Sequence, residues 1–255
     1  MKLATWNVNS VRAREARLCA WLARHQPDVL CLQELKGSAD VFPHAAVAAL
    51  GYSAVLAAQR TYNGVAILSR TPAAAVALGL DDGVDDPQAR LVAATVAGVR
   101  ILSVYVPNGG EVGSDKWAYK LDWLARLSRY LERHARADEP LVVCGDFNIA
   151  PEDRDVAVPE RWRGSVLCHD DARARLRSLC AWGLVDLLRR VRAEAGIYSW
   201  WDYRNLALAR DDGLRIDLVL GTEGIRCRDA AVDRDERKGE KPSDHAPVVV
   251  ELEVS

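Results

Sequence analysis

Residues 141–148 read LVVCGDFN, and the rest of the chain is interpreted around this segment. Its apolar run is long enough for a buried β-strand, and Gly145 lets another group approach closely. Because side chains alternate along a strand, Asp146 and Asn148 are expected to share one face at the strand's end, where α/β sheets place their chemistry. Asp146 would orient and deprotonate a water, and Asn148 would hydrogen-bond an oxyanion. The same letters also fit an Asx-turn that only caps a loop.

The composition is that of a globular protein with ample material for a core. Of the 255 residues, 49% are hydrophobic and 27% are charged. We expect a single domain over residues 1–255, because no repeat, low-complexity segment or linker divides the chain. The net charge of −2 argues against a protein wrapped in nucleic acid, although local basic patches are compatible with it. Arginines cluster at 161 and 163, at 173, 175 and 177, and at 189, 190 and 192. Each cluster is a candidate phosphate-facing patch, but the second is expected to be a solvated helix face instead.

Cysteine usage and the N-terminal sequence both indicate a reducing compartment. The six cysteines include no CxxC pair, so neither a zinc site nor a disulfide framework is expected. The first ten residues, MKLATWNVNS, pass into a strand pattern without the basic and apolar regions of a signal peptide. No apolar stretch reaches about 18 residues. We therefore expect a cytoplasmic protein without membrane segments, and a monomer by default.

Hydrophobic periodicity predicts alternating strands and helices. Strands are expected at residues 2–8, 28–32, 64–69, 91–96, 100–106, 141–148, 214–220 and 246–254. Helices are expected at about 11–25, where Ser10 is a candidate cap, at 117–136 and at 170–182. The helix at 117–136 is expected to pack against the core and to have no other role. The acidic loop at 81–88 is expected to be a solvated turn, and residues 149–169 are expected to form an irregular connection.

Polar side chains follow several of these strands. Asn7 lies near the end of the first strand, and Glu34 follows the second. Glu34 is either a metal ligand or simply the first charged residue of a surface loop. Tyr105 ends another strand, where a half-buried structural tyrosine is equally compatible. Asp217 lies inside an apolar strand, where an unpaired carboxylate would be costly, and His245 is its candidate partner.

The segment SWWDYR at 199–204 places two tryptophans beside Asp202 and Arg204. Paired aromatic side chains of this kind either stack on a base or sugar or fill a corner of the core, and core filling is the default.

Nine blocks in order resemble the exonuclease III type of apurinic/apyrimidinic endonucleases, within the wider endonuclease/exonuclease/phosphatase superfamily. The blocks are TWNVNSVRAR at 5–14, PDVLCLQELK at 27–36, NGVAILS at 63–69, YVPNG at 105–109, GDFN at 145–148, AWGLVD at 181–186, SWWDYR at 199–204, LRIDLVL at 214–220 and KPSDHAP at 241–247. The resemblance implies an α/β fold, a four-layer sandwich in which two mixed β-sheets pack face to face with helices outside.

The resemblance also implies roles for individual residues. The implied metal ligands are Asn7, Asp146, Asn148, Asp244 and His245 around Glu34, the main one. The implied catalytic residues are Tyr105, Asp146, Asn148, Asp217 and His245. The implied DNA contacts are Asn108, Trp200, Arg204, Leu214 and Ile216, with Trp200, Leu214 and Ile216 lining a pocket for a flipped sugar that lacks its base.

The implied activity is Mg²⁺-dependent hydrolysis of duplex DNA at abasic sites and 3′-ends, with Mn²⁺ as a substitute for Mg²⁺. Either Asp146 or His245 would serve as the base. Two departures from the family pattern stand out: Leu35 replaces a threonine, and VLCHDDAR at 166–173 replaces a small residue and a proline. We expect the first to remove a donor near the metal and the second, through Leu167 or His169, to crowd the sugar pocket.

Two other functions compete with this one. A phosphatase acting on phosphorylated lipid or inositol would keep the same catalytic core, but SWWDYR and YVPNG argue against it. A DNA-binding scaffold without activity would not need the full set of catalytic residues.

Overall fold

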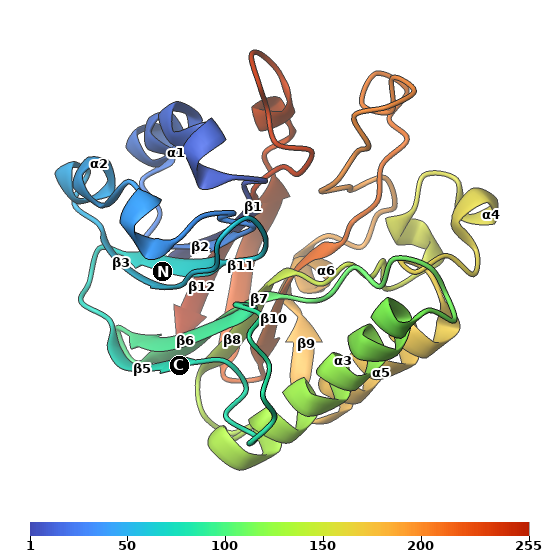
Figure 1. The fold of residues 1–255 in the computed structure, drawn as a ribbon, viewed down its shortest axis with the longest axis horizontal. Coiled ribbons are helices and arrows are strands. Elements are labelled where there is room, and N and C mark those ends of the chain that lie inside the picture. The colour runs from blue at the N-terminus through green and yellow to red at the C-terminus, as the bar shows by residue number, and fades with distance from the viewer. Residues whose placement is uncertain (255) are drawn as a thin grey trace.

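The computed structural model describes residues 1–254 and contains two six-stranded sheets (Figure 1). The strands are β1 Lys2–Asn7, β2 Val29–Gln33, β3 Ser53–Ala57, β4 Val65–Ser69, β5 Ala74–Leu78, β6 Leu91–Val96, β7 Val99–Tyr105, β8 Leu141–Asp146, β9 Leu184–Asp186, β10 Asp217–Thr222, β11 Ile225–Val232 and β12 Val248–Val254. The α-helices are α1 Val11–His25, α2 His44–Ala49, α3 Asp115–His134, α4 Pro159–Trp162, α5 Asp170–Ala181 and α6 Leu187–Val191.

The strand order is β11-β12-β1-β2-β4-β3 in the first sheet and β5-β6-β7-β8-β10-β9 in the second. Each sheet contains one parallel pair, β1 with β2 and β7 with β8, among antiparallel neighbours, so both sheets are mixed. A hydrophobic core lies between the sheets and includes Ile67 from one sheet and Val142 from the other.

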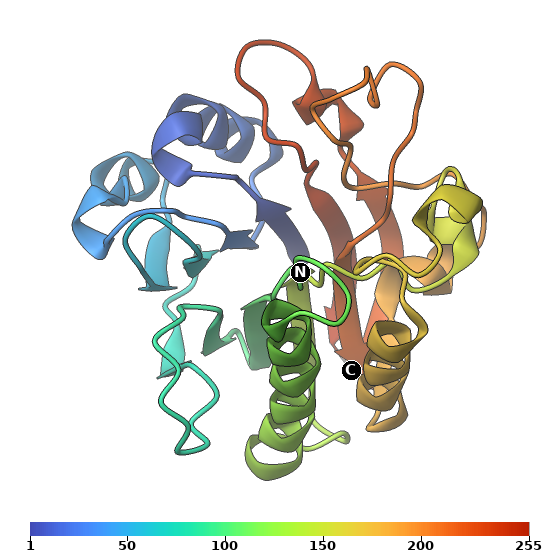
Figure 2. The same ribbon diagram turned by 45° about the vertical axis from the view of Figure 1, so that its right-hand side comes forward.

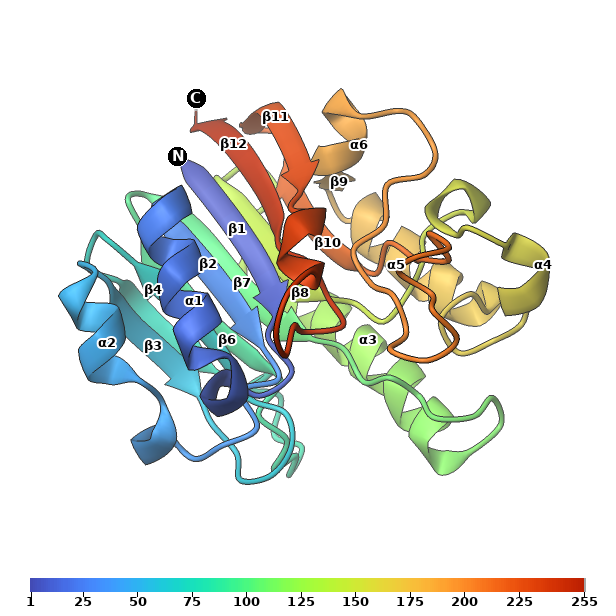
Figure 3. The same cartoon turned by 90° about the horizontal axis from the view of Figure 1, so that it is seen from above.

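Helices cover the two outer faces. Helix α1 packs Leu18 and Trp21 onto the first sheet, as the view from above shows (Figure 3). Helices α3 and α5 run side by side over the second sheet and bury Leu127 and Leu176 there (Figure 2). The order helix, sheet, sheet, helix confirms the predicted four-layer α/β sandwich.

The predicted core elements are found with small shifts at their ends. Ser10 caps α1 as expected, because its hydroxyl accepts a hydrogen bond from Ala13 N. The strand predicted from residue 214 begins only at Asp217, since Leu214 pairs instead with Val156 and Trp200 in isolated bridges. Strands β3, β5, β9 and β11 were not predicted from the sequence. Strand β5 lies at the edge of its sheet and is mostly exposed, and β11 contains charged residues. Neither sequence therefore has the continuous apolar pattern of a buried strand.

Two interpretations of charged segments are wrong. The acidic loop at 81–88 is not merely solvated, because Asp82 and Asp86 form ion pairs with the buried guanidinium of Arg126. Helix α3, which carries Arg126, therefore does more than pack. Arg189 of the third arginine cluster is also buried, against Asp155, and so is not free to face a phosphate.

All six cysteines are free. No helix within residues 1–254 combines the length and apolar character needed to cross a membrane.

Candidate active site

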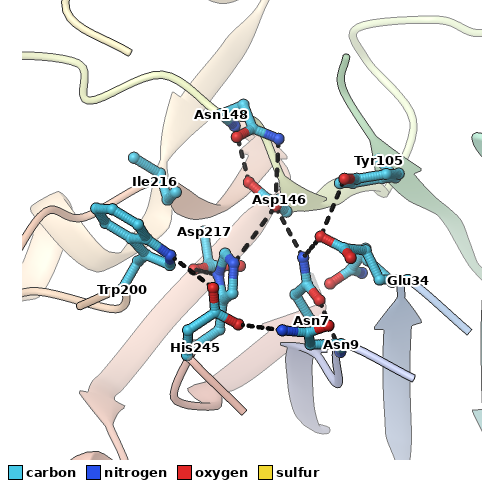
Figure 4. Close-up of polar contacts among 12 residues, drawn as sticks. Asn7, Asn9, Glu34, Tyr105, Asp146, Asn148, Trp200, Ile216, Asp217 and His245 are labelled. Carbon is cyan, nitrogen blue, oxygen red and sulfur yellow. Dashed lines mark hydrogen bonds and ion pairs between the residues drawn. The ribbon is translucent and has the colours of Figure 1, made fainter. Parts of the chain in front are cut away.

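The site forms where strands of both sheets end. Asn7 is the last residue of β1, and it pairs with Gln33, so Glu34 follows at the same edge. In the second sheet Tyr105 and Asp146 are register partners that end β7 and β8. Asp217 begins the antiparallel strand β10 directly opposite Asp146. Polar residues that are far apart in sequence thus meet in one place (Figure 4).

The Glu34 carboxylate lies at the centre of a set of donors. Its Oε1 accepts hydrogen bonds from Asn7 Nδ2 and the Tyr105 hydroxyl, both at 2.9 Å. Its Oε2 pairs with Lys36 Nζ at 2.6 Å. Burial alone would raise the pKa of Glu34, but the Lys36 charge and the Asn7 hydrogen bond hold it below its usual value. Glu34 is therefore ionised at neutral pH and is no ordinary loop residue.

Asp146 and Asn148 come together through a turn and not through strand alternation. The strand ends at Asp146, and Asn148 has a positive φ of 49°. Asp146 Oδ1 accepts from Asn148 N at 2.8 Å, which is an Asx-turn, and Oδ2 accepts from Asn7 Nδ2 at 2.9 Å. Both interpretations of this segment are therefore partly correct: an Asx-turn is present, and it places the two side chains at one site.

His245 lies between two aspartates. Its Nδ1 is 2.8 Å from Asp217 Oδ2, and its Nε2 is 3.7 Å from Asp146 Oδ2. The same Asp217 oxygen also accepts from the Ser199 hydroxyl at 2.6 Å. The expected partnership of Asp217 and His245 is thus present as a contact.

Burial and charge set the protonation of this group. Burial would lower the pKa of His245, but Asp217 and Asp146 outweigh it and raise that pKa to about 10. Burial, together with the charges of Asp217 and Glu34, raises the pKa of Asp146 to about 7 against the opposing effects of His245 and Asn7. At neutral pH the imidazole is therefore cationic, and the Asp146 carboxyl group is protonated in part of the molecules.

The donor set fits a hard divalent cation. One ligand atom from each of Glu34, Asp146 and His245 lies within 4.8 Å of the others. The two carboxylates suit Mg²⁺ or Mn²⁺ better than a structural zinc, whereas His245, which is cationic at neutral pH, has no free lone pair to offer. Asn7 faces the carboxylates with Nδ2, because its Oδ1 accepts from Asn9 N at 3.0 Å. In this arrangement the Asn7 amide nitrogen donates to both proposed carboxylate ligands, Glu34 and Asp146.

Two further residues expected as ligands make hydrogen bonds of their own. Asn148 Nδ2 donates to Val106 O and, at 3.3 Å, to Asp146 Oδ2, and its Oδ1 accepts from Asn108 Nδ2 at 3.0 Å. Asp244 accepts from Asn9 Nδ2 at 2.8 Å and from Trp200 Nε1 at 3.0 Å.

The predicted sugar pocket is filled by the chain's own side chains. Leu214 and Ile216 are 0% and 2% exposed and pack in one cluster with Leu167 and the half-buried Trp200. His169 caps α5, and its ring packs edge-on against Trp117, with 4.9 Å between the ring centroids. It also borders this cluster, because it lines a surface pocket together with Val156 and Cys168. Of the two residues expected to crowd the pocket, Leu167 is the one that packs within the cluster.

The two tryptophans of SWWDYR divide their roles. Trp201 is buried in the core, as the default interpretation held, whereas Trp200 lies beside the site. Arg204 is exposed and paired with Asp202. Leu35 lies in the core under α1 and does not face the site.

Sequence reasoning missed Asn9, Lys36 and Ser199. Asn9 and Lys36 lie two residues beyond Asn7 and Glu34, so their position beside predicted site residues was an available signal. Ser199 carries no such signal, because its contact with Asp217 depends on how the loop at 199–213 folds over β10.

A two-sheet α/β sandwich with this group of carboxylates and imidazolium at its joined strand ends defines the class of phosphoester hydrolases. The family follows from the comparisons. A model described as the endonuclease/exonuclease/phosphatase family matches residues 4–245, and the chain belongs to this family.

Similar proteins give the group within the family. Exodeoxyribonuclease III of Haemophilus influenzae is 32% identical over 266 residues, which cover 99% of this chain and all of the relative. An AP endonuclease from Archaeoglobus fulgidus has a TM-score of 0.96 and 40% identity, with 100% of both chains covered. A 3′ phosphatase from Neisseria, bound to product DNA hairpin, has a TM-score of 0.95 and 43% identity, with 99% of both chains covered. The resemblance to the exonuclease III family is confirmed, and the chain is a nuclease of this group.

Proposed function

We propose that this nuclease is a Mg²⁺-dependent, monomeric phosphodiesterase that acts on duplex DNA, cutting 5′ to abasic sites and removing nucleotides or blocking groups from 3′-ends. The observation that carries the proposal is the pairing of an ionised Glu34 with the Asp217–His245–Asp146 arrangement at one edge of both sheets. One cluster therefore supplies a cation site, a base and a fixed positive charge. Each of the three contributes to single-step hydrolysis of a phosphodiester: the cation and the positive charge stabilise developing negative charge, and the base activates water.

Water would attack phosphorus in line, and the 3′-oxygen would leave. A divalent cation bound at Glu34 would stabilise the charge on the leaving oxygen. Asn148, Asn7 and Tyr105 would hydrogen-bond the phosphate oxygens, each exchanging a hydrogen bond that it makes within the protein when no substrate is bound. The pKa of Tyr105 is raised well above its usual value by burial and by Glu34 and Asp146, so its phenol keeps its proton and remains a donor.

Asp146 is the better base of the two candidates. A base must be unprotonated at the working pH, and the pKa of His245 is raised to about 10. Asp146, whose pKa is raised to about 7, can take a proton from water and release it near neutrality. His245 would instead act as an imidazolium that stabilises negative charge in the transition state.

A duplex with one tetrahydrofuran abasic analogue and one labelled end tests this function. We expect a single Mg²⁺-dependent cut 5′ to the lesion, or shortening from the 3′-end, and neither in EDTA nor with Asp146→Asn. A soluble phosphoinositide is the matched negative substrate. Release of phosphate from it without any DNA cleavage would replace the nuclease proposal by the phosphatase alternative.

A narrower function, restricted to 3′-ends, is favoured by one observation. Leu167, only 5% exposed, packs in the same cluster as the predicted pocket walls Leu214 and Ile216. A flipped sugar would have to displace Leu167, whereas a terminal 3′-group does not need the pocket to the same depth. Steady-state rates on abasic duplex and on 3′-phosphoglycolate duplex separate the two cases. Equal, high rates on both would refute the restriction.

A further inference from the structure

Lys120 is a fully buried lysine of α3 that lies behind the site. Its side chain is 0% exposed and passes under Trp117, with Nζ 5.8 Å from the ring centroid. Burying an ammonium group is costly unless hydrogen bonds replace its water. Burial lowers the pKa of Lys120, against the Asp146 charge, which raises it, and three hydrogen bonds to backbone carbonyls favour the charged form. Because burying this ammonium group is unfavourable, packing alone does not explain a lysine at this position.

The ammonium group donates to three backbone carbonyls from three different connections. The distances from Nζ are 2.6 Å to Val166 O, 2.7 Å to Asn148 O and 3.1 Å to Asn108 O. A lysine ammonium has three hydrogens, so these contacts use its full donor capacity. The three carbonyls belong to the connections that follow β7, β8 and α4.

Each connection carries a residue of the proposed reaction. Asn148 is proposed to bind the reacting phosphate, Asn108 donates to Asn148 Oδ1, and Leu167, which directly follows Val166, packs with the proposed walls of the sugar pocket. Asn148 and the glycine next to Asn108 both have positive φ angles, 49° and 95°, so these loops are not held in place by regular structure. A Cβ at Gly109 would lie 2.9 Å from Lys120 Cδ, which shows how closely loop and lysine fit.

We infer that Lys120 is a positioning residue for the nuclease reaction: its ammonium group ties the Asn108, Asn148 and Val166 loops together and so fixes the amide of Asn148 against the substrate phosphate. It does not touch substrate itself. The inference rests on the proposed function, because Asn148 matters only if a phosphodiester is the substrate. Loss of these three hydrogen bonds would displace Asn148, and a misplacement of about 1 Å lowers the rate about 100-fold.

Steady-state kinetics of Lys120→Met test the inference on the 3′-phosphoglycolate and abasic duplexes. The substitution keeps the length and apolar stem but removes all three donors. We expect kcat to fall about 100-fold, with KM changing less than about threefold, because Asn148 acts at the reacting centre. The matched control is Leu131→Ala, which removes a buried side chain near the C-terminal end of the same helix, about three turns from Lys120. It should lower Tm and leave kcat unchanged.

Chemical rescue distinguishes positioning from general stability. In Lys120→Ala, n-propylammonium can occupy the cavity and donate to the carbonyls, so we expect kcat to recover at least tenfold. Tetramethylammonium at equal concentration has the charge but no N–H group and should restore nothing. If Lys120→Ala lost activity only because it is less stable, n-propylammonium and tetramethylammonium would have the same effect on kcat.

Several outcomes would overturn the inference. Wild-type kcat and KM in folded Lys120→Met, or no rescue by n-propylammonium, would show that Lys120 only stabilises the fold. If Lys120→Met does not fold, Lys120→Arg replaces it, since it keeps a charge and donors but cannot direct a planar group at all three carbonyls. Wild-type constants in that variant would also overturn the inference. A wild-type protein that cleaves neither duplex would refute the proposed function and the inference with it.

Discussion

His245 is a buried cation whose charge depends on its neighbours. It is only 3% exposed, yet Asp217 and Asp146 keep it protonated at neutral pH. Asp217 in turn accepts from Ser199, although its Oδ1 has no hydrogen-bond partner among residues 1–254. The pair could be anticipated because a carboxylate in an apolar strand requires a partner. The role of Ser199 could not, since hydroxyl groups are common in loops and only the folded chain brings this one to Asp217.

Asp217→Asn should remove most of the activity while leaving the fold in place. The amide is nearly the same size but no longer balances the imidazolium, so both the charge and the orientation of His245 change. We expect kcat to fall by roughly 100- to 10,000-fold, by analogy with the loss of an aspartate that orients a catalytic histidine. Ser199→Ala removes only the supporting hydroxyl and should cost less than tenfold. Equal losses in the two variants would contradict a specific role for the Asp217 charge.

Leu167→Ala should change substrate preference more than overall rate. Removing the side chain opens space in the cluster with Leu214 and Ile216, where an abasic sugar would sit. We expect the ratio of kcat/KM for abasic duplex to that for 3′-phosphoglycolate duplex to rise at least tenfold, or about 1.4 kcal/mol. His169→Ala is the control, because His169 packs on Trp117 outside the cluster, and it should leave the ratio unchanged.

At the scale of elements, the sequence predicts the strands that are buried along their whole length but not the strands at the edges of the sheets. Strands β2, β4 and β8 are buried at every position, and each follows from its sequence alone. Strand β3 lies at the edge of its sheet and is only partly buried, so its alternation is weak. The edge at which Asn7, Glu34 and Asp146 meet was implied by the rule that polar groups follow strand ends. Their distances depend on the pairing of β1 with β2 and on the face-to-face packing of the sheets, which no local pattern encodes.

A buried ion cluster ties together the elements behind the sugar pocket. Asp155 Oδ1 binds both Arg189 and Arg215, and Arg215 also pairs with Asp186 at 2.7 Å. Burial would raise the pKa of Asp155, but the two arginines hold it below its usual value. A carboxylate whose pKa is lowered in the folded state stabilises the protein above its unfolded pKa of about 3.9, and this contribution disappears as the pH falls through the folded value.

Asp155→Asn should therefore destabilise the protein in a pH-dependent way. Removing one partner leaves buried arginine charge uncompensated, which costs about 3–5 kcal/mol. We expect that difference in the free energy of unfolding from wild type at pH 7, and a smaller one below about pH 4, measured by urea denaturation. Asp138→Asn removes an exposed ion pair with Arg136, and its urea midpoint should match that of wild type at both pH values. A difference that grows as the pH falls would contradict the assignment.

At the scale of the whole molecule, the site joins the two sheets. Asn7, Glu34 and His245 come from the sheet of β1, β2 and β12, and Tyr105, Asp146 and Asp217 come from the sheet of β7, β8 and β10. The negative charges on opposite sheets oppose one another, and Glu34 contributes to the raised pKa of Asp146. A divalent cation held by Glu34 and Asp146 would relieve this repulsion and link the sheets. Metal binding and global stability should therefore be coupled.

Mg²⁺ or Mn²⁺ should accordingly raise the melting temperature of the protein without any DNA present. A ligand at about 100 times its Kd stabilises the folded state by about 2.7 kcal/mol, which for a chain of this length corresponds to a Tm increase of about 5 °C or more. EDTA should reverse the increase. Glu34→Gln should abolish it, because the amide lacks the charge that holds the cation, whereas Glu240→Gln on the exposed loop should retain it. Because Tm is read without substrate, an equal increase in Glu34→Gln would mean that the stabilising cation binds elsewhere, even if DNA cleavage were still lost in that variant.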